Sequence, residues 1–196
     1  MVKRLFDILA SSVALILLFP VLLILGISVA INSPGGAFFR QVRVGKGGRE
    51  FRLLKFRSMR PDSEAGGQIT VGERDPRITG IGHFLRRTKL DELPQLINIL
   101  KGEMSVVGPR PEVPKYVALY TTEQRKVLSV RPGLSSLASI AFINENEILG
   151  RSSDPERTYT EEVMPAKLEL DLKYLREQSL TLDFKVIAGT LWRSVR

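Results

Sequence analysis

Two adjacent carboxylates, Asp91 and Glu92, follow a basic cluster and precede a run of apolar residues spaced three and four apart. This spacing predicts a short amphipathic helix whose apolar face is formed by Leu93, Leu96, Ile97 and Leu100. Pro94 lacks a backbone N–H and is tolerated only in a first turn, so we expect the helix to begin close to Asp91.

If Asp91 is the N-cap, both carboxylates lie where free N–H groups and the helix dipole favour negative charge. We therefore expect Asp91 and Glu92 to stay ionised at neutral pH, ready to hold a divalent metal or to attack as a nucleophile. An ordinary capped helix with acidic first-turn residues has the same pattern, so this alternative stays open at this stage.

Several cations stand in settings that suit an anionic ligand. In the strand-like run 50–59, Lys55 and Arg57 share parity, and so share a face, with Phe51 and Leu53. Two cations on the more apolar face indicate a bound anion nearby; an edge strand with solvated charges is the alternative. Arg110 lies between two prolines and Arg131 precedes Pro132, and a stiff backbone lowers the cost of presenting a guanidinium to a phosphate. A rigid turn with an exposed arginine remains the alternative.

Composition limits the class of protein. The chain has 196 residues, enough for one domain with a sizeable core plus an appendage, and a formal net charge of +8. This charge indicates an anionic partner such as nucleic acid, anionic lipid or a phosphorylated substrate. With no cysteine, the chain can form neither a disulfide nor a thiolate metal site.

The segment 8–31 carries no charge and consists mostly of Leu, Ile, Val and Ala. As an unbroken helix it would be about 36 Å long, enough to cross a hydrocarbon core of about 30 Å. Basic residues lie on both sides of it, and Pro20 removes a backbone hydrogen bond at its middle. We therefore expect a re-entrant helix–break–helix that returns both ends to the same membrane face; a single span is the alternative.

The remaining elements suggest an α+β fold that is mostly helical. Two strands, 38–44 and 50–59, predict a small β-hairpin, and 61–76 is expected to be a loop. A short helix is expected within 78–90, two helices at 160–178 and 181–196, and a strand or a short helix at 134–143.

Trp192 and Arg193 suit the headgroup level of a bilayer, although an ordinary surface helix is as consistent. We expect a membrane segment at 1–34 and a compact cytoplasmic catalytic domain at 35–196.

Six stretches occur together in an order that resembles the bacterial sugar transferases, specifically the small monotopic polyprenol-phosphate phosphoglycosyl transferases. They are the N-terminal apolar segment, Leu54-Lys55-Phe56-Arg57-Ser58-Met59, Asp75-Pro76-Arg77-Ile78-Thr79, Lys89-Leu90-Asp91-Glu92-Leu93-Pro94-Gln95-Leu96, Gly108-Pro109-Arg110-Pro111 and Arg131-Pro132-Gly133. The resemblance covers essentially the whole chain, and with no transmembrane bundle before the catalytic part it is similar to the minimal form.

The resemblance implies transfer of a sugar 1-phosphate from a UDP-sugar to undecaprenyl phosphate at the cytoplasmic face of the bacterial inner membrane, with UMP as the second product. Asp91 would be the nucleophile, and Asp91 and Glu92 would hold Mg²⁺. Pro20 would be the break of the membrane helix. Phosphate groups would be bound by Lys55, Arg57, Arg86, Arg110 and Arg131.

Two positions depart from the family's pattern. Phe19 precedes Pro20 where the family often has a serine, and the run 134–139 differs from the usual sequence after Arg131-Pro132-Gly133.

A membrane-anchored binding protein without catalysis is the rival function. A nucleic-acid partner is not expected, because the cations are scattered among prolines and turns. The sequence leaves the sugar and any homo-oligomer open.

Overall fold

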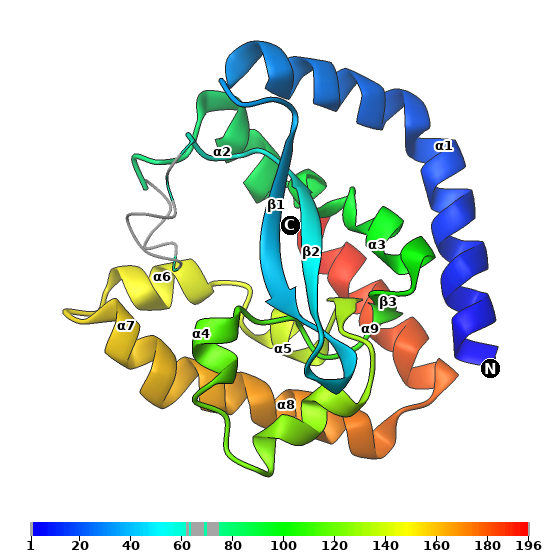
Figure 1. Cartoon of the computed structure of the whole chain (residues 1–196), viewed down its shortest axis with the longest axis vertical. Helices are drawn as coiled ribbons and strands as arrows, with labels where there is room; N and C mark the ends of the chain where they lie inside the picture. The colour runs from blue at the N-terminus through cyan, green and yellow to red at the C-terminus, as the bar shows by residue number, and fades with distance from the viewer. Residues whose placement is uncertain (1, 62, 64–68, 70–74, 196) are drawn as a thin grey trace.

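The computed structural model describes residues 2–61, 63, 69 and 75–195. Its first element, α1 (Val2–Asn32), is one continuous helix with Pro20 inside it. Figure 1 shows that α1 bends, so that its two halves run along two adjacent sides of the molecule. A bend is the expected effect of the missing proline N–H. The expected break is therefore replaced by a bent but uninterrupted helix.

The N-terminal half of α1 is tied to the domain by polar contacts. Asp7 is buried and accepts hydrogen bonds from Ser105 Oγ and from the backbone N–H of Val106, both at 3.0 Å. Arg4 donates to the carbonyls of Ile99 and Leu100, at 2.6 and 2.9 Å. These carbonyls lie at the C-terminal end of a helix, where unpaired acceptors and the dipole favour a cation.

The C-terminal half of α1 packs through apolar side chains. Leu25 and Val29 form a buried cluster with Phe56 and Leu85, which belong to elements later in the chain. The opposite side of α1 is exposed along its length, with Val2, Leu9, Ile16, Leu17, Phe19, Ile24 and Ile31 among its exposed side chains. Among the described residues, α1 is the one helix long and apolar enough to cross a membrane.

The predicted β-hairpin is confirmed. β1 (Phe38–Val44) pairs antiparallel with β2 (Glu50–Phe56), in a register that places Phe38 opposite Phe56 and Val44 opposite Glu50. The connection includes Gly47 and Gly48, both at positive φ, where glycine carries no steric penalty. Most of the loop expected at 61–76 lies outside the described residues.

After the hairpin, α2 (Gly80–Arg87) begins at Thr79, whose side chain accepts from the backbone N–H of Gly82 at 3.0 Å. Then come the 3₁₀ turn Leu90–Glu92 and α3 (Gln95–Lys101), which packs against the N-terminal half of α1. The expected helix near Asp91 therefore begins four residues later, and its N-cap is Pro94. Asp91 lies in the preceding 3₁₀ turn, so its expected capping role is wrong.

A second small sheet joins two distant proline-rich segments. β3 (Ser105–Val107) pairs parallel with β4 (Gly133–Ser135), and α4 (Pro114–Val117) and the 3₁₀ segment Gln124–Ser129 lie between them in the chain. Gly108 and Gly133 meet where the backbone segments that follow β3 and lead into β4 cross. A Cβ on Gly133 would lie 2.1 Å from the backbone N of Gly108. The crossing therefore requires glycine.

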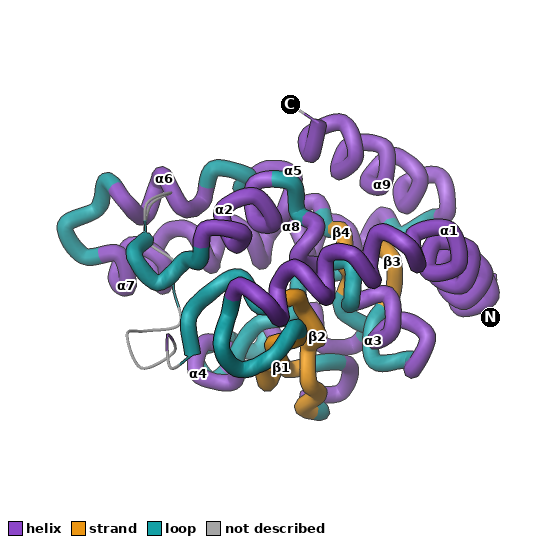
Figure 2. Tube along the Cα trace, turned by 90° about the horizontal axis from the view of Figure 1, so that it is seen from above, coloured by secondary structure: helices purple, strands orange, loops and turns teal. Residues whose placement is uncertain are grey.

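The C-terminal part is helical and continues through α5 (Leu137–Ala141), α6 (Glu145–Gly150), α7 (Pro155–Thr158), the π-helical turn Tyr159–Val163, α8 (Met164–Glu177) and α9 (Leu180–Val195). The open segment 134–143 thus contains both a strand end and a helix. Figure 2 shows α9 on the same side of the molecule as α1. The rings of Phe6 and Phe184 contact edge to face at 5.4 Å between centroids, which brings exposed side chains of α9 such as Leu180 and Phe184 close to α1.

Candidate active site

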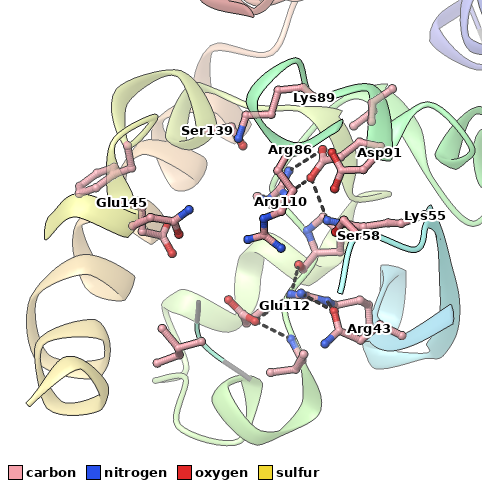
Figure 3. Close-up of a pocket in the computed structure, with 18 of the residues that line it drawn as sticks. Arg43, Lys55, Ser58, Arg86, Lys89, Asp91, Arg110, Glu112, Ser139 and Glu145 are labelled. Atoms are coloured by element: carbon pink, nitrogen blue, oxygen red, sulfur yellow. Dashed lines mark hydrogen bonds and ion pairs between the residues drawn. The ribbon is translucent and has the colours of Figure 1, made fainter. Parts of the chain in front are cut away.

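A cavity of about 780 Å³ opens between the hairpin, the turn at Asp91, the segment after β3, and helices α5, α6 and α8 (Figure 3). It is lined by Lys55, Arg57, Arg86, Asp91, Glu92 and Arg110, six of the seven residues expected to bind substrate or metal. Basic side chains outnumber acidic ones in the described lining, which suits an anionic ligand.

Glu92 is held by two cations. Its Oε1 atom lies 2.9 Å from Lys55 Nζ and 2.5 Å from an Arg110 guanidinium nitrogen, and Oε2 accepts a longer bond from Arg110 at 3.3 Å. Burial alone would raise the pKa of Glu92, but the charges of Arg110 and Lys55 and their hydrogen bonds hold it well below its usual range. The expectation that Glu92 stays ionised is supported.

Asp91 has a different environment although it is the neighbouring residue. It is 6% exposed, and its Oδ1 atom has no hydrogen-bond partner among the described residues. Burial raises the pKa of Asp91, while the charge of Lys55 opposes this shift and that of Glu92 adds to it. The direction is opposite to the one expected from a helix N-terminus, because burial dominates and Asp91 caps no helix. One carboxylate of the pair is thus engaged and the other keeps a free oxygen.

The cations around the pair come from three separate elements. Lys55 lies on β2, Arg86 at the end of α2 and Arg110 after β3, and the close-up shows them grouped with Asp91. Burial lowers the pKa of Lys55, and the charge of Glu92 opposes that change. The charge of Glu92 raises the pKa of Arg110, which therefore stays fully protonated. The charges of Arg86 and Lys89 favour the ionised form of Asp91 and so lower its pKa.

Two predicted phosphate-binding residues have other contacts. Arg57 lines the cavity, but its guanidinium donates to the carbonyls of Gly35, Gly36 and Phe38, at 2.7, 3.0 and 3.1 Å. These bonds close the connection between α1 and β1. Arg131 does not line the cavity, and its Nε atom donates to the carbonyl of Gly102 at 2.7 Å. The structure therefore brings Arg57 to the site and does not bring Arg131 there.

The acceptors suit Mg²⁺ only in part. No group of three or more His, Cys, Asp or Glu side chains that could hold a metal occurs among the described residues. Mg²⁺ often takes one or two carboxylates and completes its shell with water and substrate phosphates. The free Oδ1 of Asp91 fits this pattern, whereas both oxygens of Glu92 already contact cations.

Sequence reasoning missed the far wall of the cavity. Glu145 and Asn146 on α6, Lys167 and Asp171 on α8, and Glu112 line it. Glu112 accepts from Arg43 at 3.0 Å, from the backbone N–H of Val113 at 2.7 Å and from the hydroxyl of Tyr159. None of these residues belongs to a short motif, so only their placement by the fold could reveal them.

The bent apolar helix suggests a membrane-associated protein, and the cationic cavity with its pair of acids suits anionic ligands. Comparison with known families makes this specific: the family model described as bacterial sugar transferase matches residues 1–196, and the chain belongs to this family.

Three relatives extend the comparison. The UDP-glucose:undecaprenyl-phosphate glucose-1-phosphate transferase of Xanthomonas campestris pv. campestris is 40% identical over 200 residues, covering 97% of this chain and 38% of the relative. The UDP-N-acetylgalactosamine-undecaprenyl-phosphate N-acetylgalactosaminephosphotransferase of Aeromonas hydrophila is 37% identical, covering 97% and 43%. The exopolysaccharide production protein PSS of Rhizobium leguminosarum bv. phaseoli is 38% identical, covering 96% and 92%. The chain thus spans about two fifths of the first two relatives and nearly all of the third.

Proposed function

We propose that this protein transfers a sugar 1-phosphate from a UDP-sugar to undecaprenyl phosphate, which forms an undecaprenyl-diphosphate sugar and UMP. The names of the Xanthomonas and Aeromonas relatives describe reactions of this class. The observation that carries the proposal is the buried Asp91, which has a free oxygen and is surrounded by Lys55, Arg86 and the Glu92–Arg110 pair.

The reaction needs two displacements at one phosphorus atom. A carboxylate oxygen of Asp91 attacks the sugar-linked phosphorus of the donor, the bond from that phosphorus to the bridging oxygen breaks, and UMP leaves. A phosphate oxygen of undecaprenyl phosphate then attacks the same phosphorus, and the bond to Asp91 breaks. Two anionic substrates and an anionic nucleophile repel one another, so both steps depend on the cations Lys55, Arg86 and Arg110.

The two acids would have separate tasks. Glu92 would fix the positions of Lys55 and Arg110, because both cations contact its carboxylate. Asp91, rather than Glu92, would be the protein's ligand to Mg²⁺, since its Oδ1 is unpaired. Mg²⁺ when bound would neutralise phosphate charge at this end of the cavity.

The acceptor requires a site at the membrane surface, because its lipid tail cannot leave the bilayer and the nucleotide sugar cannot enter it. We propose that α1 enters one leaflet and returns, which would make the protein monotopic on the cytoplasmic face. Both halves of α1 pack on the same domain, through Arg4 and Asp7 near one end and Val29 near the other. A straight spanning helix could not make both sets of contacts.

The test is release of UMP from a panel of UDP-sugars with undecaprenyl phosphate and Mg²⁺. Asp91→Asn should lower the rate by about 10³-fold or more, since the amide is a poor nucleophile. Asp154→Asn, at an exposed acid outside the cavity lining, is the matched control. Incubation with donor alone should add the mass of a sugar phosphate to the wild type and not to Asp91→Asn.

Two results would overturn the proposal. If the Asp91→Asn protein released UMP at the wild-type rate, Asp91 could not be the nucleophile. No UMP from the wild-type protein with any donor of the panel, alongside retained binding to lipid phosphate, would support the rival function of a binding protein without catalysis.

A further inference from the structure

The far wall of the cavity holds a charged cluster that the proposed displacement steps do not use. Lys167 on α8 and Glu145 on α6 form an ion pair at 2.6 Å, and both line the cavity together with Asp171. In Figure 3, Glu145 faces Arg110 across the open part of the site. The reacting phosphate is expected at the opposite end, beside Asp91.

Asp171 is the unusual member of this cluster. It is 4% exposed, and its Oδ1 atom has no hydrogen-bond partner among the described residues. Burial raises the pKa of Asp171 to about 7, against the charge of Lys167 and a hydrogen bond from the Arg110 backbone. An unpaired buried acceptor costs free energy, which a ligand with a hydrogen-bond donor can recover.

We propose that Asp171 accepts a hydrogen bond from a hydroxyl group of the donor's sugar, with the Lys167–Glu145 pair beside it, and that this wall helps to select the sugar. The inference rests on the proposed function. Carboxylates are strong acceptors for hydroxyl groups and repel phosphates, so an acid-rich wall suits the uncharged part of the donor.

The position of Asp171 favours the sugar over the ribose. The backbone of Arg110 lies near enough to Asp171 to oppose the rise of its pKa, and the guanidinium of the same residue contacts Glu92, the neighbour of Asp91. One residue therefore links the two ends of the site. In a nucleoside diphosphate sugar, the sugar is bonded to the phosphate that Asp91 attacks, whereas the ribose lies one phosphate further away. The closest hydroxyl-bearing group is thus the sugar.

The experiment combines Asp171→Asn with a panel of UDP-sugars and their single-deoxy analogues, using UMP release to obtain kcat/KM. The variant should lose about 10- to 100-fold with the preferred sugar, and the loss should vanish with the analogue that lacks the contacted hydroxyl. A structural role would reduce all donors by the same factor. Equal losses across the panel would therefore overturn the proposal.

Three controls make the result specific. Glu147→Gln lies on the same helix as Glu145 but is exposed and outside the lining, so it should keep the wild-type preference. Product inhibition by UMP, which has no sugar, should be unchanged in Asp171→Asn; a weaker inhibition would assign Asp171 to the nucleoside and overturn the proposal. The KM for undecaprenyl phosphate should also be unchanged.

If the Asp171→Asn protein does not fold, the variant Glu145→Gln tests whether this wall selects the sugar. Glu145 is only partly buried, and its loss releases Lys167. This variant should change the ratio of kcat/KM between two sugars by about threefold or more, and an unchanged ratio would overturn the proposal. These outcomes differ from failure of the proposed function, in which the wild type itself releases no UMP.

Discussion

The neighbouring carboxylates of Asp91 and Glu92 have pKa values shifted in opposite directions, because their hydrogen-bond partners differ. Glu92 contacts two cations, which keep it charged although it is largely buried, whereas Asp91 is buried with one oxygen unpaired. Burying a carboxylate without a partner is unfavourable, so the neighbouring cations must support Asp91 through charge alone. The unpaired oxygen leaves Asp91 available for the nucleophilic role proposed above.

Glu92→Gln tests the role of this residue as the support of Lys55 and Arg110. We expect kcat/KM for UMP release to fall by about 10²-fold, because the two cations proposed to bind phosphate lose the carboxylate that positions them. The charge of Glu92 raises the pKa of Lys55, so its removal lowers that pKa further. Since only protonated Lys55 attracts phosphate, activity should decline at a lower pH in the variant than in the wild type as pH rises.

The measurement is the pH profile of kcat/KM between pH ~6 and ~10, with Glu50→Gln, an exposed residue of β2, as the control. An alkaline limit that stays in place, or moves to higher pH, would show that Glu92 does not support Lys55.

Residue patterns predicted the near side of this site and missed the far side. Lys55 was found from its parity on a strand and Arg110 from its two prolines, since both signals are local in the chain. Asp171 and Glu145 stand in ordinary polar helices, and only the packing of α6 and α8 brings them to the cavity. Arg131 shares the stiff setting of Arg110, yet the strand pairing turns it toward Gly102 instead.

At the level of elements, the crossing of two backbone segments at Gly108 and Gly133 fixes the position of Arg110. The backbone N–H of Gly133 donates to Pro109 at 2.8 Å, and that of Gly108 donates to Ser135 at 3.0 Å. The two proline-containing motifs thus support each other, and one of them projects its arginine into the cavity. From sequence alone, each motif indicates a rigid turn, and their contact was not predicted.

Gly133→Ala tests this crossing. The added Cβ would lie 2.1 Å from the backbone N and 2.5 Å from the carbonyl O of Gly108, and backbone atoms cannot move aside as a flexible side chain can. We expect a loss of about 3 kcal/mol or more in stability, or no folded protein. The comparison is thermal unfolding in detergent against Gly80→Ala, where a Cβ would meet nothing within 4 Å. A Gly133→Ala protein that unfolds at the same temperature as Gly80→Ala would contradict this account.

Element boundaries were less predictable than element types. The hairpin and α2 were expected from strand alternation and from a short helical segment, and both are present. The helix expected at Asp91 begins later, because Lys89 adopts a left-handed conformation (φ 58°) and the chain makes a 3₁₀ turn before Pro94. This arrangement aims Asp91 into the cavity instead of at a helix end.

On the scale of the whole molecule, the exposed apolar surface is concentrated on α1, with further exposed apolar side chains on the neighbouring α9. Polar contacts tie the start of α1 to the rest of the protein, including the pairing of Lys3 with the buried Asp183 at 2.5 Å. Burying this surface in one leaflet would satisfy the hydrophobic effect without breaking those contacts. By its length alone, α1 could also cross the whole membrane, so its contacts with the domain, and not its length, favour insertion into one leaflet.

Site-directed labelling decides between these placements, and the chain has no native cysteine to interfere. Val2→Cys and Asn32→Cys place exposed thiols at the two ends of α1. In intact cells, we expect an impermeant maleimide added outside to label neither position, and both to react after the membrane is opened, because each end is held against the same domain. Pro20→Ala removes the cause of the bend, so in that background the Val2→Cys thiol should become reactive from outside in a fraction of molecules. Labelling of Val2→Cys from outside in the otherwise unchanged protein would establish a single span, and it would require the contacts of Arg4 and Asp7 to be broken in the membrane.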